Sequence, residues 1–164
     1  MAVGAEQRVS ELGLAIQDFS AEPYAGVRYA TSMKPHHQVG NLLLLGGHVP
    51  ERADGTLLHP GKLGADVSVE QGVEAARLMA CNCLAGIRHA VGSLDRVKHL
   101  ARSLNFVATA ADFYDIYLVA NGATDLFRDV FGDEAGIGAR ATIGVSVLSR
   151  NACVENWLTV ELEP

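Results

Sequence analysis

The segment that most constrains the fold is residues 68–92, which the sequence predicts to be one long amphipathic helix. Apolar side chains recur at the 3.6-residue spacing of an α-helix, at Val69, Val73, Ala76, Ala80, Leu84, Ile87 and Val91. Ser68 followed by Gln71 is a capping-box signature, and Gly92 is typical of a residue that ends a helix. Alanine and glycine are frequent along the segment. We therefore expect the helix to pack closely on a sheet.

Strands are predicted on both sides of this helix. Gly40-Asn41 separates Val39 from Leu42–Leu45, and such a pair tolerates the positive φ values of a two-residue hairpin turn. Alternating apolar and polar residues predict a further strand at 97–109, in which Arg102 interrupts the alternation.

The remaining elements follow in the C-terminal third of the chain. A second helix is predicted at 122–131, beginning at Asn121-Gly122. Strands are predicted at 139–148 and 152–162, joined as a hairpin near 149–151. This order of elements favours an α+β fold in which two helices cover one face of a mixed sheet.

A chain of 164 residues is long enough for one domain with a sizeable core. Residues 1–31 are weakly patterned and are predicted to be an N-terminal extension with a short helix at 10–16. Residues 32–164 are predicted to be a single domain, because no linker or repeat divides them.

Composition excludes several function classes. The net charge is −6 and no lysine or arginine cluster occurs, so a nucleic-acid partner is disfavoured. The longest aliphatic run, Leu42–Leu45, is too short to span a membrane. The first residues lack the basic-then-apolar order of a signal peptide, so we expect a cytoplasmic location.

Metal and disulfide chemistry are also disfavoured. The three cysteines, Cys81, Cys83 and Cys153, have no zinc-like spacing and are predicted to be reduced and semi-buried. The six histidines are scattered, and none is paired with another at metal-ligand spacing on a helix. We therefore expect no metal site.

Two isolated charges stand out in the last two predicted strands. Arg140 shares a strand face with Thr142 and Gly144, and we expect the other face of that strand to pack on the helices. Glu155 shares a face with Trp157, which suggests a covered surface such as a subunit contact. With a turn at 149–151, the two charges lie about 17 Å apart along the hairpin.

Each charge therefore needs a partner from elsewhere, which a second subunit could supply. The planar fork of an arginine binds a carboxylate through two parallel hydrogen bonds, and a glutamate can hold a water molecule and accept its proton. The alternative is that these residues have structural roles only. Arg140 would then be a solvated strand end, Glu155 a charge on an edge strand, and Trp157 a packing residue. Gly46-Gly47 is more typical of a bulge or a close backbone approach than of an oxyanion-type nest, and His48 is more typical of a satisfied or half-exposed histidine than of a ligand contact.

Four segments resemble the Rid family, the reactive intermediate deaminases once labelled endoribonuclease L-PSP, and most closely its longer, divergent branch. They are GNLLLLGGHVP (40–50), the region 69–107 with VEQGVEAARLMACNCLAGI and LDRVKHLARSLNFV, NGATDLFRDVFG (121–132) and ARATIGVSVLSRNACVE (139–155). The last is the most specific, with Arg140 followed by a leucine eight residues later and Glu155 fifteen residues later.

The resemblance implies a chorismate-mutase-like α+β fold and a ring-shaped homotrimer with sites between subunits. It implies hydrolysis of enamines and imines to 2-oxo acids and ammonia, without metal or cofactor. By position, Arg140 matches the arginine that grips the substrate carboxylate, and Glu155 matches the glutamate that orients the water. Three further positions match residues that line the pocket: Gly47, Thr142 and Asn121.

This chain departs from the family pattern at the rim. Gly46-Gly47-His48 stands where the family has Ser-Gly-Gln, so a hydroxyl is missing and the imidazole of His48 is new. The tyrosine that the family has ahead of the first strand falls at about Met33, so its ring is absent here unless Tyr24 or Tyr29 reaches into the pocket. Two other functions stay open. One is a trimer that binds a carboxylate metabolite without turnover. The other is a ribonuclease, which the acidic balance disfavours.

Overall fold

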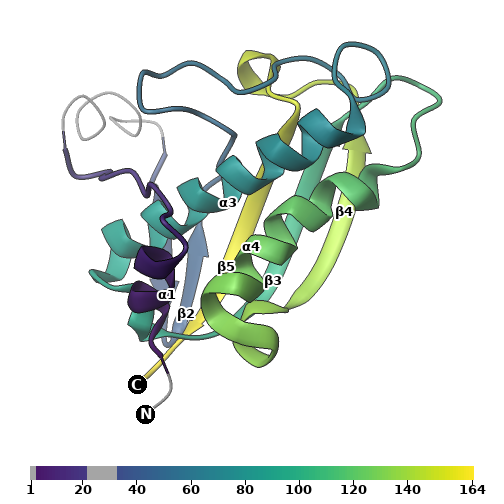
Figure 1. Cartoon of the computed structure of the whole chain (residues 1–164). Helices are drawn as coiled ribbons and strands as arrows, with labels where there is room; N and C mark the ends of the chain where they lie inside the picture. The colour runs from purple at the N-terminus through teal and green to yellow at the C-terminus, as the bar shows by residue number, and fades with distance from the viewer. Residues whose placement is uncertain (1–2, 22–32) are drawn as a thin grey trace.

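Five strands form one mixed sheet, and two long helices lie across one of its faces (Figure 1). The computed structural model describes residues 3–21 and 33–164. The elements are α1 (Ala5–Glu11), β1 (His36–Val39), β2 (Leu42–Leu45), α3 (Val69–Val91), β3 (Val97–Ala108), α4 (Ile116–Gly136), β4 (Ala139–Val145) and β5 (Val154–Leu162). Short 3-10 turns occupy Leu94–Arg96 and Ser149–Asn151.

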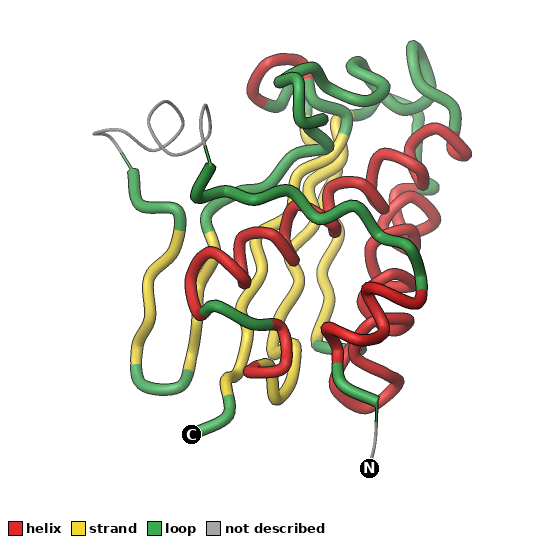
Figure 2. The backbone as a smooth tube through the Cα atoms, turned by 60° about the vertical axis from the view of Figure 1, so that its left-hand side comes forward, coloured by secondary structure: helices red, strands yellow, loops and turns green. Residues whose placement is uncertain are grey.

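The sheet order is β1-β2-β5-β3-β4, with β3 and β4 parallel and the other pairs antiparallel. Figure 2 shows from a second direction that the helices lie on the same side of the sheet. This arrangement confirms the predicted α+β fold with a mixed sheet. The hairpin predicted for the last two strands is wrong, because β3 lies between β4 and β5.

The local signals around α3 and the first hairpin are confirmed. The Ser68 side chain accepts a hydrogen bond from the Gln71 backbone N–H, and the Gln71 side chain accepts one from the Ser68 backbone N–H. Gly92 ends the helix at a φ of 84°. Val39 pairs with Leu42 across the two-residue turn. These features depend only on neighbouring residues, which is why the sequence reveals them.

An irregularity in β3 decides which side chains face the helices. The register with β5 shifts between Leu100 and Arg102, as a β-bulge does. Ser103 and Asn105 are therefore buried beneath the helices, while Leu104 and Phe106 lie on the outer face.

The register of β4 against β3 reverses the prediction for the facing of β4. Arg140 pairs with Ser103, and Thr142 pairs with Asn105, so both face the helices rather than away from them. Ile143 pairs with Phe106 on the outer face and is 44% exposed.

Two helix predictions also need correction. Helix α4 begins at Ile116, so Asn121-Gly122 lies inside it rather than at its start. Gly122 permits close contact with α3, since a Cβ atom there would lie 2.2 Å from the Val73 carbonyl oxygen. The N-terminal helix spans Ala5–Glu11 instead of 10–16, and its Val9 side chain enters the core.

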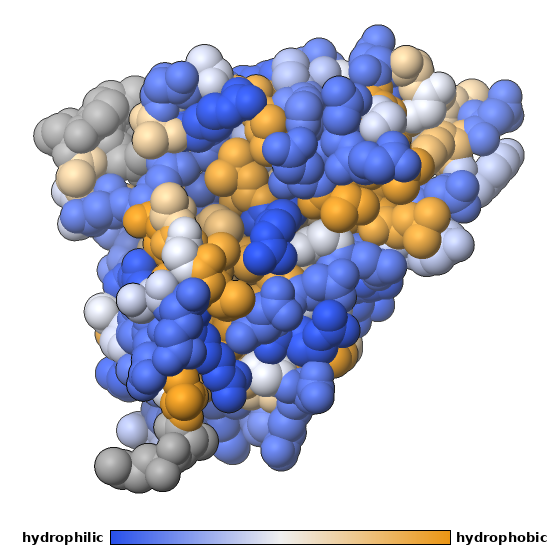
Figure 3. Space-filling view, viewed as in Figure 1, coloured by the Kyte–Doolittle hydropathy of each residue, from blue (hydrophilic) through white to orange (hydrophobic). Residues whose placement is uncertain are grey.

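The core lies between the helices and the sheet, and the helix-bearing surface is mostly hydrophilic (Figure 3). All three cysteines are free, and they are buried rather than semi-buried as the sequence predicted. Burial raises the pKa of the Cys153 thiol to about 11, so it is protonated at neutral pH. Within residues 3–21 and 33–164, no helix has the length and apolar character needed to cross a bilayer.

Candidate functional site

Arg140 is held by two side chains of α4. It projects from β4, an edge strand, toward the helices, and its Nη1 donates to Asn121 Oδ1 at 2.9 Å and to Thr124 Oγ1 at 2.9 Å. The two acceptors lie three residues apart and therefore on one face of the helix. Because a guanidinium only donates, the amide of Asn121 must turn its oxygen toward Arg140, and its NH2 group points elsewhere.

These two bonds leave one edge of the guanidinium for a ligand. Both hydrogens of Nη1 are committed to α4. The Nε–Nη2 edge keeps two parallel N–H donors, which is the geometry that a carboxylate accepts. The sequence predicted Arg140 and Asn121 here but missed Thr124, whose only sequence signal is its position three residues after Asn121.

Glu155 lies on the opposite face of the sheet. It pairs with Phe106 on the outer face, and its Oε1 accepts a 2.7 Å hydrogen bond from the indole Nε1 of Trp157. Trp157 is 51% exposed and contacts the Phe106 ring edge to face, with ring centroids 4.9 Å apart. Trp157, which the sequence suggested as part of a covered surface or as packing, therefore orients the carboxylate and leaves Oε2 for a ligand or a water.

Gly47 lies directly against this pair. A Cβ atom at position 47 would come within 2.2 Å of Glu155 Oε1 and 3.0 Å of Trp157 Nε1. The close backbone approach that we considered for Gly46-Gly47 therefore exists, and it is made to Glu155. The structure brings Gly47 and Glu155 together.

His48 is placed away from Glu155. It pairs with Asn156, whose side chain is buried on the helix side, and His48 as a whole is only 5% exposed. Its Nδ1 is 2.7 Å from the Gly46 carbonyl oxygen, and its ring stacks on Phe19. A Cβ at Gly86 of α3 would lie 2.7 Å from His48 Nε2, so the imidazole packs tightly against that helix.

A buried polar row crosses the sheet beneath the helices. Asn156 donates to Asn105 Oδ1 at 2.8 Å and to Ser103 Oγ at 2.7 Å, and it is fully buried. The strand register continues this row from His48 through Asn156 and Asn105 to Thr142. Such a network is stable under a helix because its amides satisfy one another.

The predicted residues therefore form two groups. Arg140, Asn121 and Thr142 lie on the helix side at the sheet edge, and Glu155 and Gly47 lie on the outer face. Ser103 pairs with Arg140 and Phe106 with Glu155, so the two charged residues are about 14 Å apart between Cα atoms. Within one chain, a small ligand on the Arg140 fork cannot reach Glu155.

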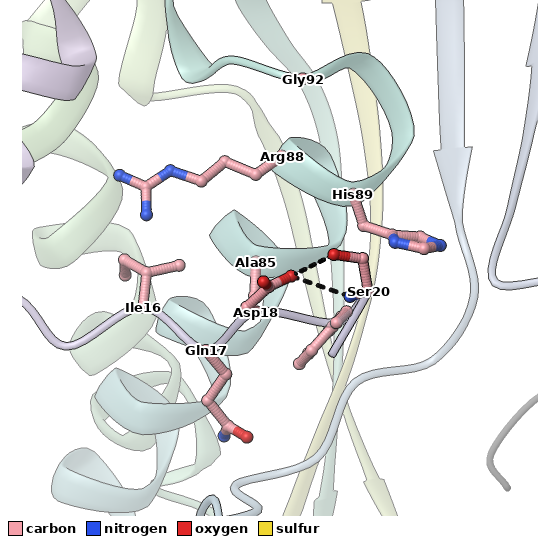
Figure 4. A pocket seen from close by; sticks show the side chains of 9 residues that line it. Ile16, Gln17, Asp18, Ser20, Ala85, Arg88, His89 and Gly92 are labelled. Atoms are coloured by element: carbon pink, nitrogen blue, oxygen red, sulfur yellow. Dashed lines mark hydrogen bonds between the residues drawn. The ribbon is translucent and has the colours of Figure 1, made fainter. Parts of the chain in front are cut away.

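The cavity of about 350 Å³ in Figure 4 is separate from both groups. It lies between residues 16–20 and the end of α3, with Asp18, Arg88 and His89 on its walls (Figure 4). None of the predicted site residues lines it. Among residues 3–21 and 33–164, no group of three or more His, Cys, Asp or Glu side chains could hold a metal ion.

Comparison with known proteins identifies related chains. The family model described as "YjgF/chorismate mutase-like, putative endoribonuclease" matches residues 8–162. Protein TCP17 of Trypanosoma cruzi is 39% identical over 123 residues, covering 75% of this chain and 76% of that protein.

Two solved structures are similar over nearly their whole length. The protein Atu1372 of Agrobacterium tumefaciens, of unknown function, is 33% identical with a TM-score of 0.84, over 97% of this chain and 94% of that one. A structure from Shewanella oneidensis MR-1, described as a "putative endoribonuclease", is 28% identical with a TM-score of 0.87, over 98% of this chain and 100% of that one.

Proposed function

Because the chain belongs to the YjgF/chorismate mutase-like family, we propose that it hydrolyses small enamine or imine carboxylates to 2-oxo acids and ammonia. The observation that carries this proposal is the Arg140 guanidinium, which α4 holds so that its Nε–Nη2 edge can donate two hydrogen bonds to a carboxylate. Thr142 faces the same side of the sheet as Arg140, and Asn121 holds Nη1 through its amide oxygen.

The reaction needs little beyond positioning. An imine carbon is electrophilic, so a water oxygen can add to it while Glu155 accepts one proton of that water. The C=N electron pair moves to the nitrogen, which takes up a proton. The hydroxyl proton of the adduct is transferred to the amine, which leaves as ammonia as the C=O bond forms. An enamine enters the same route after a proton moves from its nitrogen to its terminal carbon, which gives the imine. One water is consumed, and the chemistry requires neither a metal nor a redox cofactor.

We further propose that the complete site forms between copies of the chain in a homotrimer. The two groups of site residues lie on opposite faces of the sheet, so the Glu155 that meets a ligand on Arg140 must come from another copy. The outer face also exposes apolar side chains of three strands, namely Leu42, Leu44, Ile143 and Trp157. An exposed apolar face of this kind is typical of a protein–protein interface.

Ammonia release tests the activity. A pyridoxal-phosphate dehydratase acting on serine supplies 2-aminoacrylate, and the ammonia release rate is compared with no addition, with wild type and with Arg140→Ala. We expect acceleration by the wild type only. A wild type no faster than Arg140→Ala, but still able to bind pyruvate, favours the carboxylate-binding trimer instead.

Two further measurements address the remaining expectations. Sedimentation equilibrium tests the trimer, and a stable monomer contradicts a shared site. Arg140-dependent cleavage of RNA by the purified protein would favour the ribonuclease, which the net charge of −6 disfavours. The cytoplasmic location stays a prediction.

A further inference from the structure

We propose that Thr124 is a positioning residue for Arg140, and that it determines which edge of the guanidinium meets the substrate carboxylate. The inference rests on the proposed function, because it assumes that Arg140 binds a carboxylate. Thr124 is not among the residues that the family resemblance assigns to the pocket.

The hydrogen bonds of Thr124 point its oxygen lone pairs toward Arg140. Its Oγ1 lies 3.4 Å from the Ala120 carbonyl oxygen one turn earlier, which accepts the hydroxyl proton. The same Oγ1 accepts from Arg140 Nη1 at 2.9 Å. The hydroxyl therefore acts as an acceptor toward the guanidinium, and the α4 backbone keeps it in that role.

A second acceptor is needed to orient the guanidinium. With Asn121 alone, Nη1 is anchored through one hydrogen, and the guanidinium plane can still swing about that bond. Thr124 takes the other hydrogen of the same nitrogen. Two acceptors on one side of Nη1 hold the guanidinium plane, so the Nε–Nη2 edge faces away from α4.

This orientation matters because Arg140 is exposed. A long, exposed side chain loses conformational freedom when it binds a ligand, and a side chain that is already ordered loses less. Thr124 should therefore strengthen carboxylate binding without touching the ligand. Because the orientation is the same for substrate and transition state, its loss should raise KM more than it lowers kcat.

The test compares two substitutions of Thr124 in the full-length protein. Thr124→Val keeps the shape but removes the acceptor, and Thr124→Ser keeps the oxygen. Calorimetry with pyruvate gives Kd, and the coupled assay gives KM and kcat. We expect Thr124→Val to raise Kd and KM about tenfold, as for loss of a hydrogen bond to a charged group. Thr124→Ser should stay within about twofold of wild type.

A double-mutant cycle separates orientation from general damage. In an Arg140→Lys background no planar fork remains to orient, so Thr124→Val should weaken pyruvate binding by much less than in the wild type. Equal effects in both backgrounds, or an unchanged Kd for Thr124→Val, overturn the inference and leave the proposed function intact. A wild type that neither binds pyruvate nor releases ammonia contradicts both.

Discussion

Gly47 lies so close to Glu155 that a Cβ atom at position 47 would come within 2.2 Å of the carboxylate oxygen Oε1. Gly47→Ala should therefore displace this carboxylate from its bond with Trp157. We expect the kcat of ammonia release to fall about tenfold or more, because a misplaced base loses its alignment with the water. The affinity for pyruvate should change little, since Arg140 is untouched.

Gly144→Ala is a matched control for this substitution. A Cβ at Gly144 would contact Thr109 Oγ1 at 3.4 Å, which is an ordinary contact distance. We expect near-wild-type activity from this control. A Gly47→Ala protein with unchanged kcat would show that the close approach has no role in the reaction.

The indole of Trp157 is predicted to hold Glu155 in place through the 2.7 Å hydrogen bond from Nε1. Trp157→Phe keeps an aromatic ring against Phe106 but removes the donor. We expect kcat to fall by about threefold to tenfold, in line with the loss of one hydrogen bond to a charged group. Trp157→Ala, which also removes ring packing, should lower thermal stability as well. Identical kcat values for wild type and Trp157→Phe contradict this role.

The crossing of α3 and α4 is predicted to depend on Gly122. A Cβ there would lie 2.2 Å from the backbone oxygen of Val73, and neither backbone can yield without shifting its helix. Gly122→Ala should destabilise the protein by about 1–3 kcal/mol despite the better helix propensity of alanine, because overpacking outweighs propensity. Thermal unfolding measures the effect, and an unchanged or higher Tm would show that the helices can separate at little cost.

The ion pair of Glu6 with Arg88 is predicted to give a pH-dependent contribution to stability. Burial raises the pKa of Glu6, but hydrogen bonds from Arg88 and from the Leu94 backbone outweigh it, so the pKa lies below its usual 4.5. A lowered pKa means that the stabilisation is present above the unfolded-state pKa and is lost as the pH falls through the folded-state pKa.

Glu6→Gln tests this dependence because it removes the charge and keeps the shape. Its Tm should be below that of the wild type at pH 7, and the difference should shrink as the pH falls below 4.5. A difference that stays constant down to pH 3 would assign the effect to packing of α1 rather than to charge.

How well each element could be predicted depends on the range of the interactions that stabilise it. Ser68, Gln71 and Gly92 bound α3 through contacts with close neighbours, and Gly40-Asn41 sets the first hairpin in the same way. The start of α4 was missed because Ile116, Tyr117 and Val119 are weak helix formers, and burial of Val119 in the core stabilises that first turn.

The pairing of β4 and β5 and the side of the sheet that their residues face could not be predicted, because both depend on segments far away in the sequence. The link between β4 and β5 was predicted to be a hairpin turn because it is short. Instead, the end of β3 enters between them, with Thr109 donating to the Val145 carbonyl and Ala108 to that of Cys153. Arg150 and Asn151 adopt positive φ values of 57° and 63° in this link, which no local signal indicates.

The sequence by itself determined the class of fold, the helix 69–91, the first hairpin and the identity of the two isolated charges, since these rest on local periodicity, caps and residue type. Only the tertiary structure decided that Arg140 faces α4, that Thr124 and Trp157 each hold one of those charges, and that the charges lie on opposite faces. The physical reason is that the facing of these residues follows from the strand register, which shifts twice along β3, and that contacts between strands and helices form only once distant segments pack together.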